Sequence, residues 1–286
     1  MMTRTPSGTY VIPGMETRWP ARGRLPAGHA WSVTTILGIL DKPGLRYWYG
    51  YQQRDAEREA ARLAVVEAQE PIQPGEAGAA WLLDAMAARS SRALAAIETS
   101  AKAMDLGSLI HAAIEARLLG ERFDEADMGD EAKRCLAAWA EWVEAVHLDS
   151  MAVEQRVYSE VERYAGTLDC VAELDGSIVP GAPQRIVAVI DWKTSGAKSG
   201  RAIYPEWLMQ VSAYSHAYCL RDRGAAWALV VRLPKTTEAI AATEVACGRP
   251  FEVAILSPKE QRRYMLAFLR VKDAHDAMMQ IEKRTL

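Results

Sequence analysis

The sequence contains no apolar run that approaches the ~20 residues needed for a membrane-spanning helix. Its first residues, MMTRTPSGTYVIPG, lack the apolar stretch of a secretory signal peptide. Half of the residues are hydrophobic (50%) and a quarter are charged (25%), as in ordinary globular proteins. We therefore expect a cytoplasmic protein without membrane contacts.

Cysteine is scarce. The four cysteines are Cys135, Cys170, Cys219 and Cys247, and no two of them have C-x-x-C spacing. Zinc and iron–sulfur sites commonly use such closely spaced pairs. Reduced, mostly buried thiols are the simplest interpretation.

An excess of positive charge is also absent, because 34 Lys and Arg face 37 Asp and Glu, for a net charge of -3. This balance argues against a protein that coats nucleic acid non-specifically. It does not exclude an enzyme that acts on nucleic acid, since a local basic track and bound metal ions can reverse the charge of a site. There is no G-x-x-x-x-G-K-[ST] motif of a nucleotide-driven motor.

The pattern of the chain changes near residue 150. Residues 1–31 predict an irregular lead-in with one short strand at Thr9–Ile12, and residues 32–148 are rich in Ala, Leu and Glu and predict helices. Residues 150–286 mix strand and helix patterns. We expect one α/β domain over 1–286, with a mixed central sheet flanked by helices and a helical N-terminal elaboration.

The predicted strands are Val153–Val161, Tyr164–Leu174, Arg185–Thr194, Ala225–Leu233 and Phe251–Leu256. The predicted helices are Val33–Leu40 with Ser32 as N-cap, a stretch from Leu45 past Leu63, 77–104, 106–119, 130–147, Tyr204–Leu220 and a last helix from the capping box at Ser257 to about Lys283.

One predicted strand ends in Asp191-Trp192-Lys193. The two-residue period of a strand places Asp191 and Lys193 on the same face. A carboxylate there can hold a hard cation, and a lysine can orient a water or steady a phosphate. A surface ion pair is the alternative for so short a motif.

A second carboxylate, Asp169, lies 22 residues earlier in Gly166-Thr167-Leu168-Asp169, within the preceding predicted strand. If the two strands pair, Asp169 and Asp191 can face one cation. Two carboxylates and a lysine would suit metal-assisted hydrolysis of a phosphodiester. A turn aspartate is the alternative.

Two predicted helices carry further polar pairs. Gly107, His111 and Glu115 share one helix face, and His111 is a possible nitrogen ligand. Gln210 and Tyr214 are four residues apart on the helix after the Asp-x-Lys strand and can face one site. The alternatives are a histidine satisfied by a local hydrogen bond and an ordinary amphipathic helix.

In order and type, these elements resemble the RecB-like branch of the PD-(D/E)xK nuclease superfamily. The branch pattern of G-x-x-x-H, G-x-x-D, D-x-K and Q-x-x-x-Y is matched here by Gly107 and His111, Gly166 and Asp169, Asp191 and Lys193, and Gln210 and Tyr214. Ser32–Leu37 also looks like the start of phage-encoded exonucleases of this branch, and the mitochondrial genome maintenance exonuclease is a similar, more distant type. The resemblance covers about residues 32–220.

The resemblance implies a restriction-endonuclease-like fold and a metal site. His111, Asp169 and Asp191 would bind Mg²⁺ or Mn²⁺, with the backbone carbonyl of Trp192 as a further ligand. Lys193 would position the attacking water and stabilise the developing charge. Because His111 must then reach the sheet, we treat the chain as one domain.

Other residues would have supporting roles. The resemblance implies that Gln210 and Tyr214 belong to the catalytic set by ordering the site or contacting the strand, and Glu115 and Glu154 would lie behind the ligands. Some members carry an iron–sulfur cluster held by one cysteine before the core and three after it. That arrangement is missing here, so we expect no such cluster.

The function implied is that of a DNA exonuclease acting on single strands or duplex ends in phage or bacterial replication, recombination or repair. Arg46, Trp48 and Arg54 mix cations with an aromatic ring and suit nucleic-acid binding, although such aromatics equally suit a core. A single-strand binding or annealing protein is a possible partner. A structure-specific endonuclease and a non-catalytic nucleic-acid-binding protein remain alternatives.

Overall fold

The computed structural model describes residues 1–40, 92–126, 128–179, 182–196, 201–221 and 226–281. The chain divides into two compact units, one made of Met1–Leu40 with Leu109–Leu286 and the other of Asp41–Ser108. The features below belong to the first unit. Among the described helices, none combines the length and apolar character needed to cross a bilayer.

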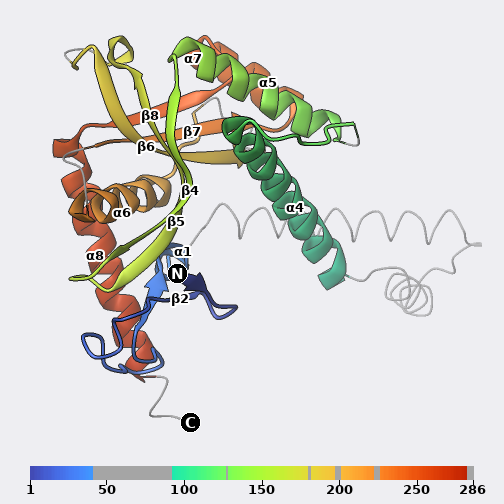
Figure 1. Cartoon of the computed structure of the whole chain (residues 1–286). Coiled ribbons are helices and arrows are strands. Elements are labelled where there is room, and N and C mark those ends of the chain that lie inside the picture. The colour runs from blue at the N-terminus through green and yellow to red at the C-terminus, as the bar shows by residue number, and fades with distance from the viewer. Residues whose placement is uncertain (41–91, 127, 180–181, 197–200, 222–225, 282–286) are drawn as a thin grey trace, which may run out of the picture. The chain divides into compact units, whose positions relative to one another are not determined.

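The first unit is built on a mixed eight-stranded sheet with the order β1-β2-β3-β5-β6-β7-β8, and β4 pairs with β5 off this path (Figure 1). The pairs β3–β5 and β6–β7 are parallel, and the others are antiparallel. The strands are β1 Thr3–Arg4, β2 Thr9–Val11, β3 His29–Ser32, β4 Asp149–Ser159, β5 Tyr164–Asp175, β6 Arg185–Ser195, β7 Trp227–Pro234 and β8 Glu252–Leu256. This confirms the expectation of an α/β fold with a mixed sheet flanked by helices.

Residues 1–31 are not the irregular lead-in that the sequence predicts. Their strands β1, β2 and β3 extend the sheet, and β3 runs parallel to the start of β5, with Trp31 opposite Tyr164 and Ser32 opposite Ala165. The strands are two to four residues long, too short for a clear alternation of apolar and polar residues. Only pairing with β5, far away in sequence, makes them part of the sheet.

The described helices are α1 Val33–Leu37, α4 Arg92–Leu119, α5 Asp130–Ala145, α6 Pro205–Arg221, α7 Thr237–Cys247 and α8 Pro258–Ile281, with a short 3-10 turn at Gly176–Ile178. Ser32 caps α1 as predicted, since its hydroxyl accepts the Thr35 amide at 3.0 Å. The expected break between helices 77–104 and 106–119 is wrong, because α4 continues through Gly107. The sequence also missed α7, whose buried side chains are only Ala239 and Thr243, so its apolar periodicity is weak.

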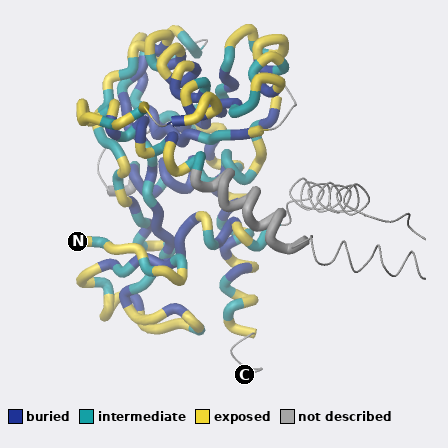
Figure 2. The backbone as a smooth tube through the Cα atoms, turned by 90° about the vertical axis from the view of Figure 1, so that its right-hand side faces the viewer, coloured by how far each residue is buried: buried dark blue, intermediate teal, exposed yellow. Residues whose placement is uncertain are grey.

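Helices cover both faces of the sheet, and the central strands are largely buried (Figure 2). On one face, α1, α6 and α8 pack against apolar side chains that include Val171, Val189 and Val230. On the other, α5 brings the rings of Trp139 and Trp142 edge-on to Trp192, at centroid distances of 6.2 and 5.2 Å.

Strand β5 changes partner halfway along its length. Tyr164 and Ala165 pair with β3, whereas Cys170 to Asp175 pair with β6. On that side, the registers of the described strands leave Gly166–Asp169 without a partner. The sheet therefore opens at this point, and the candidate site lies there.

Candidate active site

Asp169 lies where β5 and β6 part. The last residue pair between the two strands is Cys170 with Ile190. Beyond it, the Trp192 amide donates to Oδ2 of Asp169 at 2.7 Å. The side chain thus takes the place of a backbone acceptor, which fixes the carboxylate beside the main chain of β6. The Trp192 carbonyl remains a predicted ligand.

Three potential ligands converge at Asp169. The Nδ1 atom of His111, from α4, lies 3.6 Å from Asp169 Oδ2. His111, Asp169 and Glu154 of β4 form a group of three. Each offers one potential ligand atom, and these atoms all lie within 4.8 Å of one another. One imidazole nitrogen and two carboxylates suit a divalent cation such as Mn²⁺, and carboxylates also suit Mg²⁺.

Glu154 contributes more directly than the sequence indicated. Its φ angle is 48°, in the left-handed region that a residue with a side chain rarely adopts. Such a conformation costs about 1–3 kcal/mol and is common at functional sites. It lets the carboxylate join His111 and Asp169, and no side-chain pattern in the sequence reports it.

Negative charge is concentrated around Glu154. Desolvation, followed by the charges of Asp169, Glu115 and Asp191, raises the pKa of its carboxyl group to about 7. Glu115 lies one helical turn after His111, as predicted. A divalent cation would relieve this repulsion, so the residues present fit such an ion.

Asp191 and Lys193 form an ion pair next to this group, with Nζ of Lys193 2.5 Å from Oδ2 of Asp191. The two side chains therefore share a face, as the strand period predicted. Asp191 is only 1% exposed, and burial raises its pKa against the opposing pull of the Lys193 charge. Asp191 is not part of the three-residue group found among the described residues.

Gln210 of α6 contacts Asp191, and Tyr214 of the same helix contacts Gln210. The Gln210 amide donates to Oδ1 of Asp191 at 3.1 Å and to the Tyr214 hydroxyl at 3.2 Å. Burial, followed by the charges of Asp191 and Asp169, raises the pKa of Tyr214 well above its ordinary value, so the hydroxyl keeps its proton. The arrangement makes both residues positioning groups for Asp191.

Gly166 allows Tyr214 to approach the sheet. A Cβ atom at Gly166 would lie 2.3 Å from Cε1 of the Tyr214 ring. The glycine of the G-x-x-D motif and the tyrosine of the Q-x-x-x-Y motif are thus in direct contact. Their separation along the chain gave no sign of this.

The replacement Gly166→Ala is therefore expected to destabilise the fold by about 1–3 kcal/mol through overpacking, and to slow any activity that depends on Asp191. Urea denaturation measures the first effect. Gly129→Ala is the matched control, since a Cβ atom at Gly129 would meet nothing within 4 Å. Equal stability of the two variants would show that the Tyr214 contact does not constrain the fold.

The structure adds a residue that sequence reasoning missed. The hydroxyl of Tyr10, from β2, lies 2.9 Å from Oγ1 of Thr167, two residues before Asp169. Tyr10 is 2% exposed. Its strand was predicted but carries no motif, so only the pairing of the sheet brings it to the site.

Other predicted residues are placed differently or not described. Gly107 belongs to the second unit. Arg46, Trp48 and Arg54 lie outside the described residues. The four cysteines are not in disulfides, with Cys135 and Cys170 buried and Cys219 and Cys247 partly buried.

No protein-family model matches the chain, and a search of curated proteins returned no match. The site must therefore be interpreted from its own residues and from the motifs that they form.

Proposed function

We propose that the protein is a metal-dependent DNA exonuclease that hydrolyses phosphodiester bonds of single strands or duplex ends. The observation that carries the proposal is the group formed by His111, Glu154 and Asp169, whose ligand atoms lie within 4.8 Å, beside the Asp191–Lys193 ion pair. An oxygen-rich cation site next to a lysine suits phosphodiester hydrolysis.

The residues divide into two sets. His111, Glu154 and Asp169 would hold Mg²⁺ or Mn²⁺, and Asp191 and the Trp192 carbonyl are further candidate ligands. Such an ion, when bound, supplies a water of lowered pKa and neutralises charge on the phosphate.

Lys193 carries the remaining chemistry. Its ammonium group is held by Asp191, which Gln210 orients in turn. From there Lys193 can hold a water in place for attack and stabilise the negative charge that develops on the phosphate.

The substrate class comes from the motif resemblance. We propose that the protein digests DNA from strand ends in phage or bacterial replication, recombination or repair, with a single-strand binding or annealing protein as a partner. An endonuclease could use the same residues. A circular single-stranded substrate separates the two, because an obligate exonuclease leaves it intact.

The direct test uses end-labelled single-stranded DNA with Mg²⁺, with Mn²⁺ and with EDTA. We expect degradation with either metal and none with EDTA. Lys193→Ala should lower the rate by about 10²–10³-fold, the range seen when one stabilising group is removed from a transition state.

Lys133→Ala is the control for this experiment, because Lys133 is an exposed lysine on α5. Lys193→Ala leaves the buried Asp191 without its cation, which can destabilise the fold. A melting curve of each variant therefore checks that the protein is still folded. Degradation that resists EDTA, or that Lys193→Ala retains in full, would count against the proposal.

A further inference from the structure

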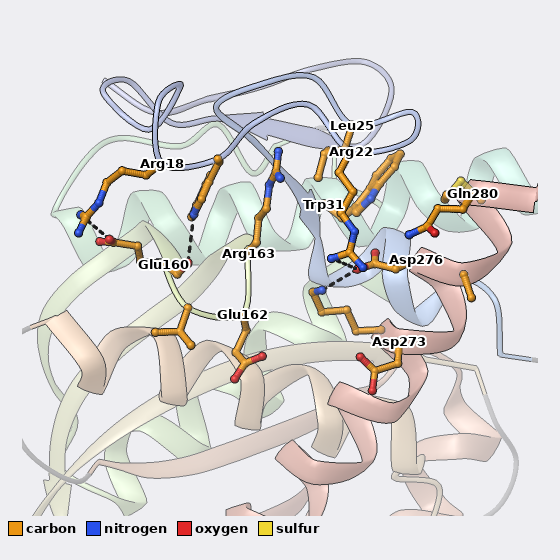
Figure 3. Close-up of a pocket in the computed structure, with 15 residues that line it drawn as sticks. Arg18, Arg22, Leu25, Trp31, Glu160, Glu162, Arg163, Asp273, Asp276 and Gln280 are labelled. Atoms are coloured by element: carbon orange, nitrogen blue, oxygen red, sulfur yellow. Dashed lines mark hydrogen bonds and ion pairs between the residues drawn. The ribbon is translucent and has the colours of Figure 1, made fainter. Parts of the chain in front are cut away.

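A separate pocket of about 760 Å³ lies at the start of β5 (Figure 3). Three segments line it: residues 18–31 of the N-terminal region, the turn 160–163 between β4 and β5, and residues 272–280 of α8. None of the lining residues belongs to the candidate metal site. The proposed metal site therefore does not account for this pocket.

Most acidic groups at the pocket already have a cationic partner. The pairs are Glu160 with Arg18, Asp273 with Arg270 at 3.6 Å and Asp276 with Lys272 at 2.8 Å. Desolvation opposes the charge of Asp276, but hydrogen bonds from His275 and Lys272 outweigh it and hold the pKa of Asp276 at about 2. These acids therefore have little capacity for another cation.

Arg163 is a cation without a carboxylate partner among the described residues. Its guanidinium donates to three backbone carbonyls, of His29 at 2.9 Å, Pro20 at 2.8 Å and Pro26 at 3.1 Å. These acceptors are neutral, and the negative charge nearest in effect is that of Asp276, which raises the pKa of Arg163 without forming an ion pair with it. The guanidinium donors of Arg163 are thus used by acceptors that carry no negative charge.

Arg22 is only loosely held. Its Nη1 atom lies 3.8 Å from Oδ2 of Asp276, the oxygen that Lys272 already contacts. After desolvation, the charge of Arg22 lowers the pKa of Arg163, so the two guanidinium groups repel each other. In Figure 3 the Glu162 carboxylate points away from both arginines.

We propose that this pocket binds a phosphate group. Arg22, Arg163 and Lys272 lie around the carboxylate of Asp276, so positive charge predominates at this corner of the pocket, while Glu160 and Asp273 pair with Arg18 and Arg270. The Arg22 side chain is 60% exposed, so its guanidinium can turn toward a ligand. Guanidinium groups match phosphate oxygens in geometry. The volume admits a phosphate together with an attached nucleoside. The source is either a free nucleotide or a phosphate of a nucleic-acid backbone.

Binding is measured on the full chain in EDTA, so that it does not depend on nuclease activity. The first probe is pyrophosphate, titrated by calorimetry against a chloride control of equal ionic strength. We expect saturable binding beyond the control. Arg22→Gln should weaken it about tenfold, as for loss of one charge-assisted hydrogen bond.

Asp276→Asn should act in the opposite direction. It removes the carboxylate that competes with the ligand for Arg22 and Lys272, so affinity should rise severalfold. Arg262→Gln is the control, because Arg262 is exposed on the same helix and does not line the pocket. Melting curves identify any unfolded variant. If Asp276→Asn fails to fold, Arg22→Gln still tests the proposal, because Arg22 is exposed and its replacement should not disturb the fold.

Two further probes distinguish the sources. Thymidine 5′-monophosphate that competes with pyrophosphate would support a nucleotide site, and a single-stranded oligonucleotide that does so would support a backbone site. The inference is wrong if the parent binds pyrophosphate no better than the chloride control. It is also wrong if Arg22→Gln binds as the parent does, or if folded Asp276→Asn binds more weakly.

Discussion

Asp169→Asn is expected to lower the rate of metal-dependent cleavage about 10³-fold, because it removes a charged ligand from the site where metal chemistry is proposed. The asparagine oxygen can still accept the Trp192 amide, which Asp169 Oδ2 accepts at 2.7 Å. The backbone around residues 169 and 192 should therefore keep its conformation. What the variant loses is negative charge beside His111 and Glu154.

Two measurements check this expectation. Single-turnover cleavage gives the rate, and titration with Mn²⁺ followed by electron paramagnetic resonance gives the affinity for the ion. We expect both to fall while the melting temperature stays near that of the parent. Asp149→Asn is the control, since Asp149 is exposed at the start of β4. Undiminished Mn²⁺ affinity in Asp169→Asn would show that the three-residue group does not hold the ion.

Arg232→Met is expected to have the largest effect on stability. The Arg232 side chain is 0% exposed, and its Nε donates to Oε2 of Glu252 at 2.8 Å. Its Nη2 donates to Oγ1 of Thr243 at 2.7 Å. The same Glu252 oxygen accepts the Ala202 amide at 2.7 Å, in the segment that leads to α6. Removing the arginine leaves a buried carboxylate uncompensated, at a cost of about 3–5 kcal/mol.

Urea denaturation measures that cost. The double variant Arg232→Met/Glu252→Leu should recover much of it, because no buried charge then remains. Arg185→Met is the matched control, since Arg185 pairs with Glu173 at 2.6 Å but both side chains are about two-fifths exposed, at 39% and 42%. Such an exposed pair contributes about 0–1 kcal/mol. Similar losses for the two arginine variants would mean that burial of the Arg232 pair is energetically unimportant.

Local patterns predicted several features correctly. Asp191 and Lys193 share a strand face, Gln210 and Tyr214 share a helix face, and Ser32 caps a helix. Each of these follows from the repeat of one element, or from one backbone hydrogen bond within four residues. Such geometry is the same in any fold that contains the element.

Contacts between distant segments were not predictable in this way. Tyr10 reaches Thr167 because β2 and β3 join the sheet through β5, and Gly166 contacts Tyr214 because α6 packs on that strand. Glu154, with its positive φ angle, lies between Val153 and Gln155, which pair with Cys170 and Leu168 of β5. Periodicity within a single element predicts neither of these two contacts nor the backbone conformation of Glu154.

The sequence by itself determined most of the longer strands and helices and which polar side chains share their faces, because periodicity and capping act over a few residues. It did not predict β1, β3 or α7. Only the tertiary structure decided that Glu154, rather than Asp191, joins His111 and Asp169 in one group. That choice depends on where β5 and β6 part and on which carboxylate Lys193 already neutralises. The Asp191–Lys193 pair lies within β6 and follows from the strand period, but the point where β5 and β6 part is set by packing between segments far apart in the chain, where the energy of a contact depends on all the neighbours that surround it.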